Sequence, residues 1–298
     1  MKNSQKYVCS ACDYIEEIEY DTKEEKINLL PPDFVCPNCK SNRDMFISCT
    51  CVKYSQESPR NLNLEEMSIG DIVSTYPQST QVFNKHDIDY CCGGKKTLGE
   101  VCLKNGLPIQ SIIDEINKSV SDNKVINVDW DKMTLGSLID HIVNYYHKRL
   151  FNDLKELDPL MAKVLKVHGK RHPELHKISQ VLAKFRQDAE IHMLKEESIL
   201  FPAIQALEVS GKFNACSGNI NYPIAVMEDE HERMAKQIEA IKEFSHNYAT
   251  PSDACGSYVR LYNKFKDIEI ELHEHVHKEN NILFKKSLNK VSLNLNLI

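Results

Sequence analysis

The sequence places a histidine and a glutamate at helical spacing in two distant segments. His192 precedes Glu196 by four residues in "EIHMLKEESILFP" (190–202), and His275 precedes Glu279 by four in "ELHEHVHKENNILF". Residues four apart lie on one face of a helix. If that face is buried, a carboxylate and an imidazole enter the core together, which is unfavourable unless both are paired or bind a metal ion.

The residues that share a face with each pair are apolar, so we expect both pairs to point into the core. They are Phe185, Ala189, Ile199, Leu200 and Ala203 for the first pair, and Ile268, Leu272, Ile282 and Leu283 for the second. A single pair is also compatible with a histidine–glutamate hydrogen bond inside an ordinary core. Two pairs on two helices favour metal ligation, because a metal ion satisfies both groups at once.

The region after residue 130 has the apolar periodicity of a four-helix bundle. Apolar residues recur at three and four in four blocks, roughly 131–156, 174–208, 222–248 and 254–288. His147 and His231 each share a face with apolar residues of the first and third blocks. Each helix therefore offers one inward histidine, and two helices also offer a carboxylate. Four imidazoles with two carboxylates that can bridge suit a non-haem di-iron centre.

The other histidines are weaker candidates for ligands. His141 lies about a third of a turn away from the inward face of its helix. His273 and His277 share a face with Asn280 and Asn281, which predicts a solvated surface. Three more histidines fall between the first two blocks, where we expect a loop and a helix start: His168, His172 and His176.

The N-terminal region contains two C-x-x-C pairs, Cys9–Cys12 and Cys36–Cys39. Four thiolates in this arrangement suit a tetrahedral zinc or iron ion. Residues 1–52 have little hydrophobic mass and would be marginally stable without such a staple. We assign no role to three further cysteines, Cys49, Cys51 and Cys102.

The residues around these cysteines resemble the rubredoxin family over about residues 6–47. The resemblance is carried by "YVCSACDY", "LPPDFVCPNCKSNRDMF" and four aromatic residues, Tyr7, Tyr14, Phe34 and Phe46. It implies one iron held by the four cysteines of the two pairs and cycling by one electron. Asp13 and Lys40 stand where rubredoxins have glycine, so a structural zinc ion stays open as the alternative.

A middle segment, "HDIDYCCGGKKTLGEVC" (86–102), contains the adjacent cysteines Cys91 and Cys92. Thr97 and Glu100 have the spacing of a capping box, which predicts that a helix starts just after "CCGGKK", with Thr97 as its N-cap. A helix N-terminus and nearby lysines should lower a thiol pKa and favour redox reactivity. The alternative is that both cysteines are small apolar residues in a helical core.

Five segments together resemble the repair-of-iron-centres family: "DIDYCCGG", "YH", "HMLKEESILFP", "VMEDEH" and "EHVHKENNILF". The resemblance covers about residues 62–288 and implies a hemerythrin-like bundle. It places iron on the residues that the helical faces also select, with His147, His192, His231 and His275 as ligands and Glu196 and Glu279 as bridges. It also implies redox work for Cys91 and Cys92.

We therefore expect a mainly α fold in three domains. A rubredoxin-like domain with a four-cysteine metal site (1–53) and a small helical domain with the adjacent cysteines (60–120) precede a hemerythrin-like di-iron four-helix bundle (127–298), and the polar stretches 54–66 and 118–129 should act as linkers. The expected function is the repair of iron–sulfur clusters damaged by nitrosative or oxidative stress, with the rubredoxin-like domain as electron donor.

Two alternatives to this function stay open. The bundle could reduce nitric oxide, dioxygen or peroxide, or it could hold dioxygen or nitric oxide without catalysis, as a carrier or sensor of hemerythrin type. A scaffold built from a zinc ribbon and a helical bundle fits less well, because it leaves the repeated histidine–glutamate pairs unexplained. Whether the chain is an enzyme stays open at this stage.

Composition narrows the expected partners. The net charge of −6 gives no basic footprint for nucleic acid, and no apolar run approaches the ~20 residues of a membrane span. The N-terminus lacks the apolar segment of a signal peptide, so we expect a cytoplasmic protein. The expected partners are damaged iron–sulfur proteins, nitric oxide or dioxygen, and a reductase that donates electrons. A homodimer is also compatible with the sequence.

Overall fold

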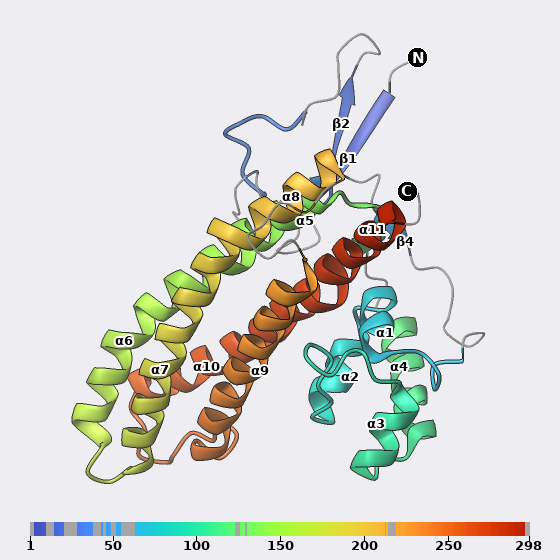
Figure 1. The fold of residues 1–298 in the computed structure, drawn as a ribbon. Helices are drawn as coiled ribbons and strands as arrows, with labels where there is room; N and C mark the ends of the chain where they lie inside the picture. Colours follow the sequence, from blue (N-terminus) through green and yellow to red (C-terminus); the bar gives the residue numbers. More distant parts are fainter. Residues whose placement is uncertain are drawn as a thin grey trace. The chain divides into compact units, whose positions relative to one another are not determined.

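The computed structural model describes residues 3–9, 15–20, 29–37, 43, 46–48, 52–54, 63–122, 126–128, 130–211, 213 and 219–295. The chain divides into two compact units, Met1–Asn144 and Tyr145–Ile298. The described residues are mainly helical, which confirms the predicted fold class (Figure 1).

The first unit begins with a small antiparallel sheet in the order β2-β1-β3. Its strands are β1 (Asn3–Cys9), β2 (Ile15–Tyr20) and β3 (Phe46–Ser48). Phe46 pairs with Cys9 and packs its ring edge-to-face against Phe34, with centroids 5.0 Å apart. Among the residues that the structure describes in this part of the chain, five apolar ones are buried: Tyr7, Cys9, Leu30, Cys36 and Phe46. Tyr14, another of the predicted aromatic residues, lies outside the described residues.

Four short helices follow in the same unit and bury their own apolar cluster. They are α1 (Ile69–Thr75), α2 (Ser79–Lys85), α3 (Leu98–Asn105) and α4 (Ile109–Asp122). The cluster includes Ile69, Phe83, Tyr90, Leu98 and Ile112. The capping box at the start of α3 is confirmed, because the Glu100 amide donates to Thr97 Oγ1 and the Thr97 amide to the Glu100 carboxylate.

The stretch 118–129, which we expected to be a linker, contains regular structure. The last turns of α4 occupy its first residues, and β5 (Ile126–Val128) follows. This strand pairs antiparallel with β4 (Val52–Tyr54). A short 3₁₀ turn η4 (Trp130–Lys132) and α5 (Leu135–His141) complete the unit, and the π-helical segment η5 (Ile142–His147) leads into the second unit.

The second unit is a four-helix bundle. Its elements are α6 (Lys148–His168), α7 (Glu174–Lys195), η6 (Glu196–Leu200), α8 (Phe201–Ser210), α9 (Asn221–Phe244), α10 (Gly256–His277), η7 (Lys278–Phe284) and α11 (Lys285–Leu295). Helix α6 contacts α7 and α10, and α9 contacts the same two helices, so the four close into a ring around a common core (Figure 1).

The first helix of the bundle is longer than its apolar block predicted. We expected it to end near residue 156, but α6 continues through Pro159 to His168. Proline in a helix interior costs about 3 kcal/mol because it lacks an amide donor. Leu157 just before the proline and Met161 and Val164 after it are buried on one face. At roughly 1.5–3 kcal/mol for each buried side chain, they outweigh the proline.

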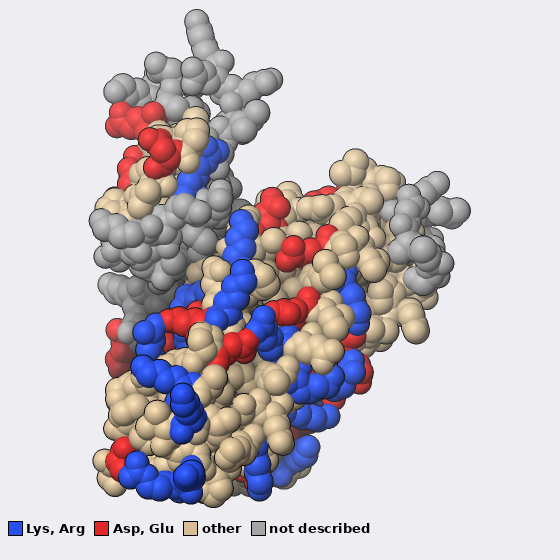
Figure 2. Space-filling model, turned by 90° about the vertical axis from the view of Figure 1, so that its left-hand side faces the viewer, with Lys and Arg blue, Asp and Glu red and all other residues tan. Residues whose placement is uncertain are grey.

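Ion pairs join neighbouring helices near the surface of the bundle. Figure 2 shows basic and acidic side chains interspersed on one face of the molecule. Lys264 on α10 lies 2.6 Å from Asp153 on α6, and Arg186 on α7 pairs with Asp158 on α6. Pairs near the surface contribute about 0–1 kcal/mol each, so the apolar core accounts for most of the bundle's stability. Among the described residues, no helix has the length and hydrophobicity to cross a membrane.

Candidate metal centre

All six predicted ligands lie in the core of the bundle, and none is more than 3% exposed. They come from four helical runs: His147 from η5, His192 and Glu196 from α7 and η6, His231 from α9, and His275 and Glu279 from α10 and η7. The facing pattern in the sequence thus brings together residues that are up to 132 positions apart, since 279 − 147 = 132.

The six residues form two overlapping groups. His147 and His275 belong to one group and His192 and His231 to the other, while Glu196 and Glu279 belong to both. Within each group, one potential ligand atom of every member lies within 4.8 Å of the others. Two metal positions that share both carboxylates are the arrangement expected of a carboxylate-bridged pair of ions.

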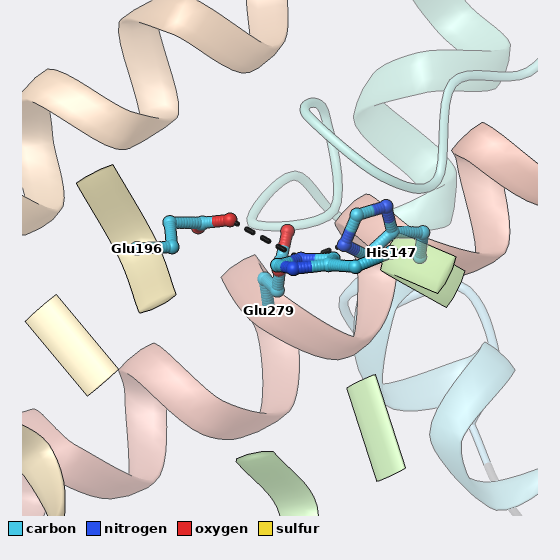
Figure 3. A group of neighbouring side chains, drawn as sticks. His147, Glu196 and Glu279 are labelled. Atoms are coloured by element: carbon cyan, nitrogen blue, oxygen red, sulfur yellow. Dashed lines mark hydrogen bonds and ion pairs between the residues drawn. The ribbon is translucent and has the colours of Figure 1, made fainter. Parts of the chain in front are cut away.

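The imidazoles direct their Nε2 atoms at the carboxylates. His147 Nε2 lies 3.4 Å from Glu196 Oε2 and 3.5 Å from Glu279 Oε1. Figure 3 shows both carboxylates pointing toward this ring. On the other side, His192 Nε2 is 3.3 Å from Glu196 Oε2, and His231 Nε2 is 3.1 Å from Glu279 Oε2. His275 Nε2 completes the set, 2.8 Å from Glu279 Oε1.

Several of these buried atoms have no hydrogen-bond partner among the described residues. They are both carboxylate oxygens of Glu196, one of Glu279 and Nε2 of His147. Leaving a buried charged group without partners costs more than the about 1–3 kcal/mol of a neutral one. Metal ions at the two positions would satisfy all four atoms, so the residues present fit a dinuclear metal centre.

Three of the four imidazoles are oriented through their other ring nitrogen. Nδ1 of His147 lies 2.8 Å from Glu197, Nδ1 of His192 lies 3.0 Å from Glu230, and Nδ1 of His231 lies 2.9 Å from the Asn280 side-chain oxygen. A carboxylate or amide oxygen accepts, so in each case Nδ1 carries the hydrogen and Nε2 presents a lone pair. Such partners fix the tautomer of metal-binding histidines.

That tautomer leaves two lone pairs opposed in the second group. His192 Nε2 and His231 Nε2 lie only 2.8 Å apart. Two unprotonated imidazole nitrogens at this distance repel each other unless a proton or a metal ion lies between them. The contact is therefore compatible with a metal position between the two rings, where the ion would replace that proton.

The charges around the six ligand residues favour a cation. Burial opposes protonation of His192, yet the negative charge of Glu196 beside Nε2 and the hydrogen bond to Glu230 raise its imidazole pKa to about 10. Burial likewise opposes ionisation of Glu279, but the charge of His275 and the close approach of the His147, His231 and His275 imidazoles hold its pKa well below the usual range. A field that favours protons on imidazoles equally favours metal cations in their place.

Three π-helical segments carry ligands. His147 is the last residue of η5, Glu196 is the first of η6, and Glu279 lies in η7. A π turn adds one residue to an α-helical turn and is found preferentially at functional sites. These segments correct one prediction, because Ile199 was expected to face inward and is 60% exposed, whereas Leu200 is buried.

Aromatic rings pack flat against three of the histidines. Tyr146 stacks on His275 with centroids 5.3 Å apart, and Phe201 stacks on His147 at 5.7 Å. Phe284 stacks on His231 at 6.3 Å. The rings limit rotation of the imidazoles and keep the surroundings of the ligands apolar, which strengthens electrostatic interactions between the ligands and a bound ion.

The family matches agree with this geometry. Residues 138–287 match the family described as Hemerythrin HHE cation binding domain, and residues 65–120 match a domain of unknown function, DUF542. The iron–sulfur cluster repair protein YtfE of Enterobacter sp. (strain 638) is 34% identical over 223 residues, which cover 75% of this chain and 97% of that relative. The chain belongs to the hemerythrin-like iron–sulfur cluster repair family.

Other members of the repair family align over the same share of the chain. The YtfE protein of Yersinia pseudotuberculosis serotype IB (strain PB1/+) is 34% identical over 76% of this chain and 99% of its own length. That of Escherichia coli O17:K52:H18 is 33% identical over 75% of this chain and 97% of its own length. The resemblance stated from the motifs is thereby confirmed for the family.

The sequence did not single out the partners of the ligand histidines in this family member. Glu197 and Glu230 were not considered, and Asn280 was placed on a solvated face although it is 6% exposed. Its neighbour on that face, His277, is 3% exposed. Their position in the sequence could have indicated them, because each of the three partners is adjacent to a predicted ligand.

The adjacent cysteines lie in the first unit, around the carboxylate of Asp89. The amides of Cys91, Cys92 and Gly93 all donate to that carboxylate, at 2.9–3.0 Å. The two sulfur atoms are 3.7 Å apart. Gly93 suits this turn, because a Cβ there would lie 2.7 Å from the Asp89 carbonyl oxygen.

The prediction that the turn lowers the thiol pKa is wrong for Cys91. A hydrogen bond with Cys92, burial and the negative charge of Asp89 raise the pKa of the Cys91 thiol well above its usual value. Cys91 is buried, and Cys92 is partly exposed.

The predicted four-cysteine site lies partly outside the described residues. Cys9 and Cys36 are fully buried in the first unit. Cys12 and Cys39 fall outside the described residues, as do Cys49 and Cys51. The site and its resemblance to rubredoxins therefore stay predictions.

Proposed function

We propose that this chain is a di-iron protein that acts in the repair of iron–sulfur clusters damaged by nitrosative or oxidative stress. His147 and His275 hold one iron, His192 and His231 hold the other, and Glu196 and Glu279 bridge the two. The observation that carries the proposal is the pair of buried groups that share both carboxylates. The names of the relatives support the repair role.

Imidazole and carboxylate ligands suit iron in this role. Two bridged irons would supply reversible one-electron chemistry and a metal ion that can be given up to a damaged cluster. The carboxylates of Glu196 and Glu279 would offset part of the positive charge of the two iron ions. Glu197, Glu230 and Asn280 keep the Nε2 lone pairs directed at the metal positions.

Electrons for the bundle come, in this proposal, from an N-terminal four-cysteine centre held by Cys9, Cys12, Cys36 and Cys39. The centre holds one iron, with zinc as the structural alternative. The burial of Cys9 and Cys36, one from each C-x-x-C pair, supports a metal site in the small core of this region. A tether to the bundle keeps the donor at high effective concentration.

The domain organisation of the proposal has three parts, residues 1–53, 60–120 and 127–298. The separate apolar cluster of α1 to α4 supports the middle part. Cys91 and Cys92 act there as redox thiols, supported by the 3.7 Å between their sulfur atoms. The protein works in the cytoplasm with damaged iron–sulfur proteins, nitric oxide or dioxygen and a reductase as partners, as a monomer or homodimer.

A reconstituted repair assay tests this function. A [4Fe–4S] dehydratase is inactivated with nitric oxide and then incubated with the iron-loaded chain and a reductant. The wild type should restore activity, and Glu279→Ala should fall to the level of free ferrous iron. Glu232→Ala is the matched control, because Glu232 is exposed beside His231 and should repair normally.

Two results of that assay would contradict the proposal. If Glu279→Ala repaired the dehydratase as well as the wild type, the metal centre of the bundle would not take part in repair. No repair by the wild type, combined with reversible binding of dioxygen or nitric oxide, would favour the carrier function instead.

A second experiment tests the electron donor. Cys36→Ser should slow reduction of the bundle irons without changing their number, and an unchanged rate of reduction would exclude the N-terminal centre as donor.

A further inference from the structure

A second cluster of potential ligands lies at the other end of the bundle. His168 is the last residue of α6, His172 lies in the turn before α7, and Asp253 lies in the turn between α9 and α10. Figure 1 shows both connections at the same end of the bundle. Helix α6 has 21 residues, begins directly after His147 and ends at His168. The second cluster is therefore about 30 Å from the dinuclear centre along the axis of this helix.

One ring nitrogen of each histidine and a carboxylate oxygen of Asp253 lie within 4.8 Å of one another. His168 is 3% exposed, and neither of its ring nitrogens has a hydrogen-bond partner among the described residues. The rings of His168, His172 and Tyr258 form a triangle, with centroids 6.2 Å apart for the two histidines and 5.2 Å and 5.5 Å from each histidine to Tyr258. Buried imidazoles are nearly always paired, so this one calls for a ligand that the surrounding side chains do not provide.

His172 is held in the orientation that a metal ligand needs. Its Nδ1 lies 3.1 Å from Glu174 Oε1, and its Nε2 lies 2.9 Å from Asp253 Oδ1. The Glu174 carboxylate can only accept, so Nδ1 carries a hydrogen. A second carboxylate then faces Nε2, and either a proton or a metal ion must lie between them. A carboxylate behind a histidine is the usual outer partner of a metal-binding imidazole.

Asp253 remains charged, and one of its carboxylate oxygens faces the two histidines of the cluster. Its hydrogen bond with His172 lowers the pKa of the carboxyl group. Oδ1 faces His172, while Oδ2 accepts from Arg171 Nη1 at 3.2 Å. The positive charge of Arg171 weakens cation binding here, but its side chain is 65% exposed, so solvent screens much of that effect.

We propose that His168, His172 and Asp253 form a mononuclear site for a divalent transition-metal ion of the zinc or ferrous class. Two imidazoles and one carboxylate suit such ions, and three protein ligands leave a position for water or a further ligand. The site shares no residue with the dinuclear centre, and the proposal does not depend on the repair function.

Zinc binding by the full-length, iron-loaded chain tests the site. After removal of excess ions, Zn²⁺ bound per chain is measured by equilibrium dialysis for the wild type, His172→Asn and Asp253→Asn. The wild type should bind one more zinc than either variant, or bind it at least tenfold more tightly. His176→Asn is the matched control, since His176 is exposed in the first turn of α7 and outside the cluster. Bundle iron should be equal in all four proteins.

Equal zinc binding by the wild type and both cluster variants would overturn the proposal. A second measurement needs no variant: Zn²⁺ should shift the side-chain ¹⁵N resonances of His168 and His172 in the wild type. If both resonances stay unchanged at a zinc concentration at which the dialysis experiment reaches saturation, the site holds no metal and the proposal is wrong.

Discussion

Glu196 illustrates how single residues combine a structural disadvantage with a function. It is fully buried in the bundle, and neither of its carboxylate oxygens has a hydrogen-bond partner among the described residues. An arrangement that is unfavourable for folding alone is expected where a ligand completes it. The apolar faces in the sequence were enough to select this residue, because a carboxylate at an inward helical position is rare without a partner.

Replacing Glu196 tests its role as a bridge. Glu196→Ala should reduce bundle iron from two to one or none and leave the metal of the N-terminal site in place. A ligand present at 100 times its Kd stabilises a fold by about 2.7 kcal/mol. Removing iron with a chelator should therefore lower the melting temperature of the wild type by about 5–10 °C. The variant should melt at nearly the same temperature with and without the chelator.

Calorimetry with and without chelator, together with iron analysis, provides these values. Glu232→Ala is the control and should behave like the wild type. Full bundle iron in Glu196→Ala would exclude this residue as a bridging ligand.

Glu230 should tune the metal through His192 rather than bind it. Loss of a carboxylate behind a ligand histidine typically lowers metal affinity by about 10- to 100-fold. We expect this loss in Glu230→Gln and not in Glu232→Gln, as measured by competition for Fe²⁺ with a chelator of known affinity. Equal affinities in the two variants would mean that Glu230 serves only its contact with Lys195 at the surface.

The adjacent thiols should differ in their response to pH. A raised pKa keeps the Cys91 thiol protonated in the folded chain, so its thiolate fraction at pH 8 is below that of a free cysteine. Iodoacetamide at pH 8 should therefore modify Cys92 before Cys91, and the rate at Cys91 should begin to rise only well above pH 9. Peptide mass analysis identifies the modified residue. Faster modification of Cys91 at pH 8 would contradict this environment.

At the scale of elements, the four helices could be predicted from apolar periodicity, but the π-helical segments could not. Each π turn shifts the following residues by about 100° around the helix axis, and a regular 3.6-residue period does not contain that shift. Glu197, Ser198 and Ile199 are consecutively exposed in η6 for this reason. The partners of the histidines were missed on related grounds, because helix rotation decides which neighbour of a ligand lies at the helix interface.

Two substitutions in η6 distinguish a π turn from a regular helix. Ile199 is 60% exposed and Leu200 is 3% exposed. Ile199→Ala should change the free energy of unfolding by no more than about 0.5 kcal/mol, whereas Leu200→Ala should lower it by about 2–5 kcal/mol. Urea unfolding of the two variants provides both values. Similar losses would indicate that both side chains face the core, as a regular helix predicted.

At the scale of the whole molecule, the family and the bundle could be predicted because motif order and helical faces agree over most of the chain. The ends of the elements could not, as Pro159 within α6 and strand β5 within an expected linker show. Both exceptions arise from tertiary contacts, in which burial or strand pairing overrides the local preference of the chain.

The proposed metal centre requires that six residues from four helices hold two irons that share Glu196 and Glu279. Mössbauer spectroscopy of the full-length chain loaded with ⁵⁷Fe would reveal such a pair. In the oxidised protein we expect two non-thiolate irons per chain that are magnetically coupled to a diamagnetic pair, separate from any thiolate-bound iron. Two uncoupled irons, or a single non-thiolate iron per chain, would contradict the bridged centre.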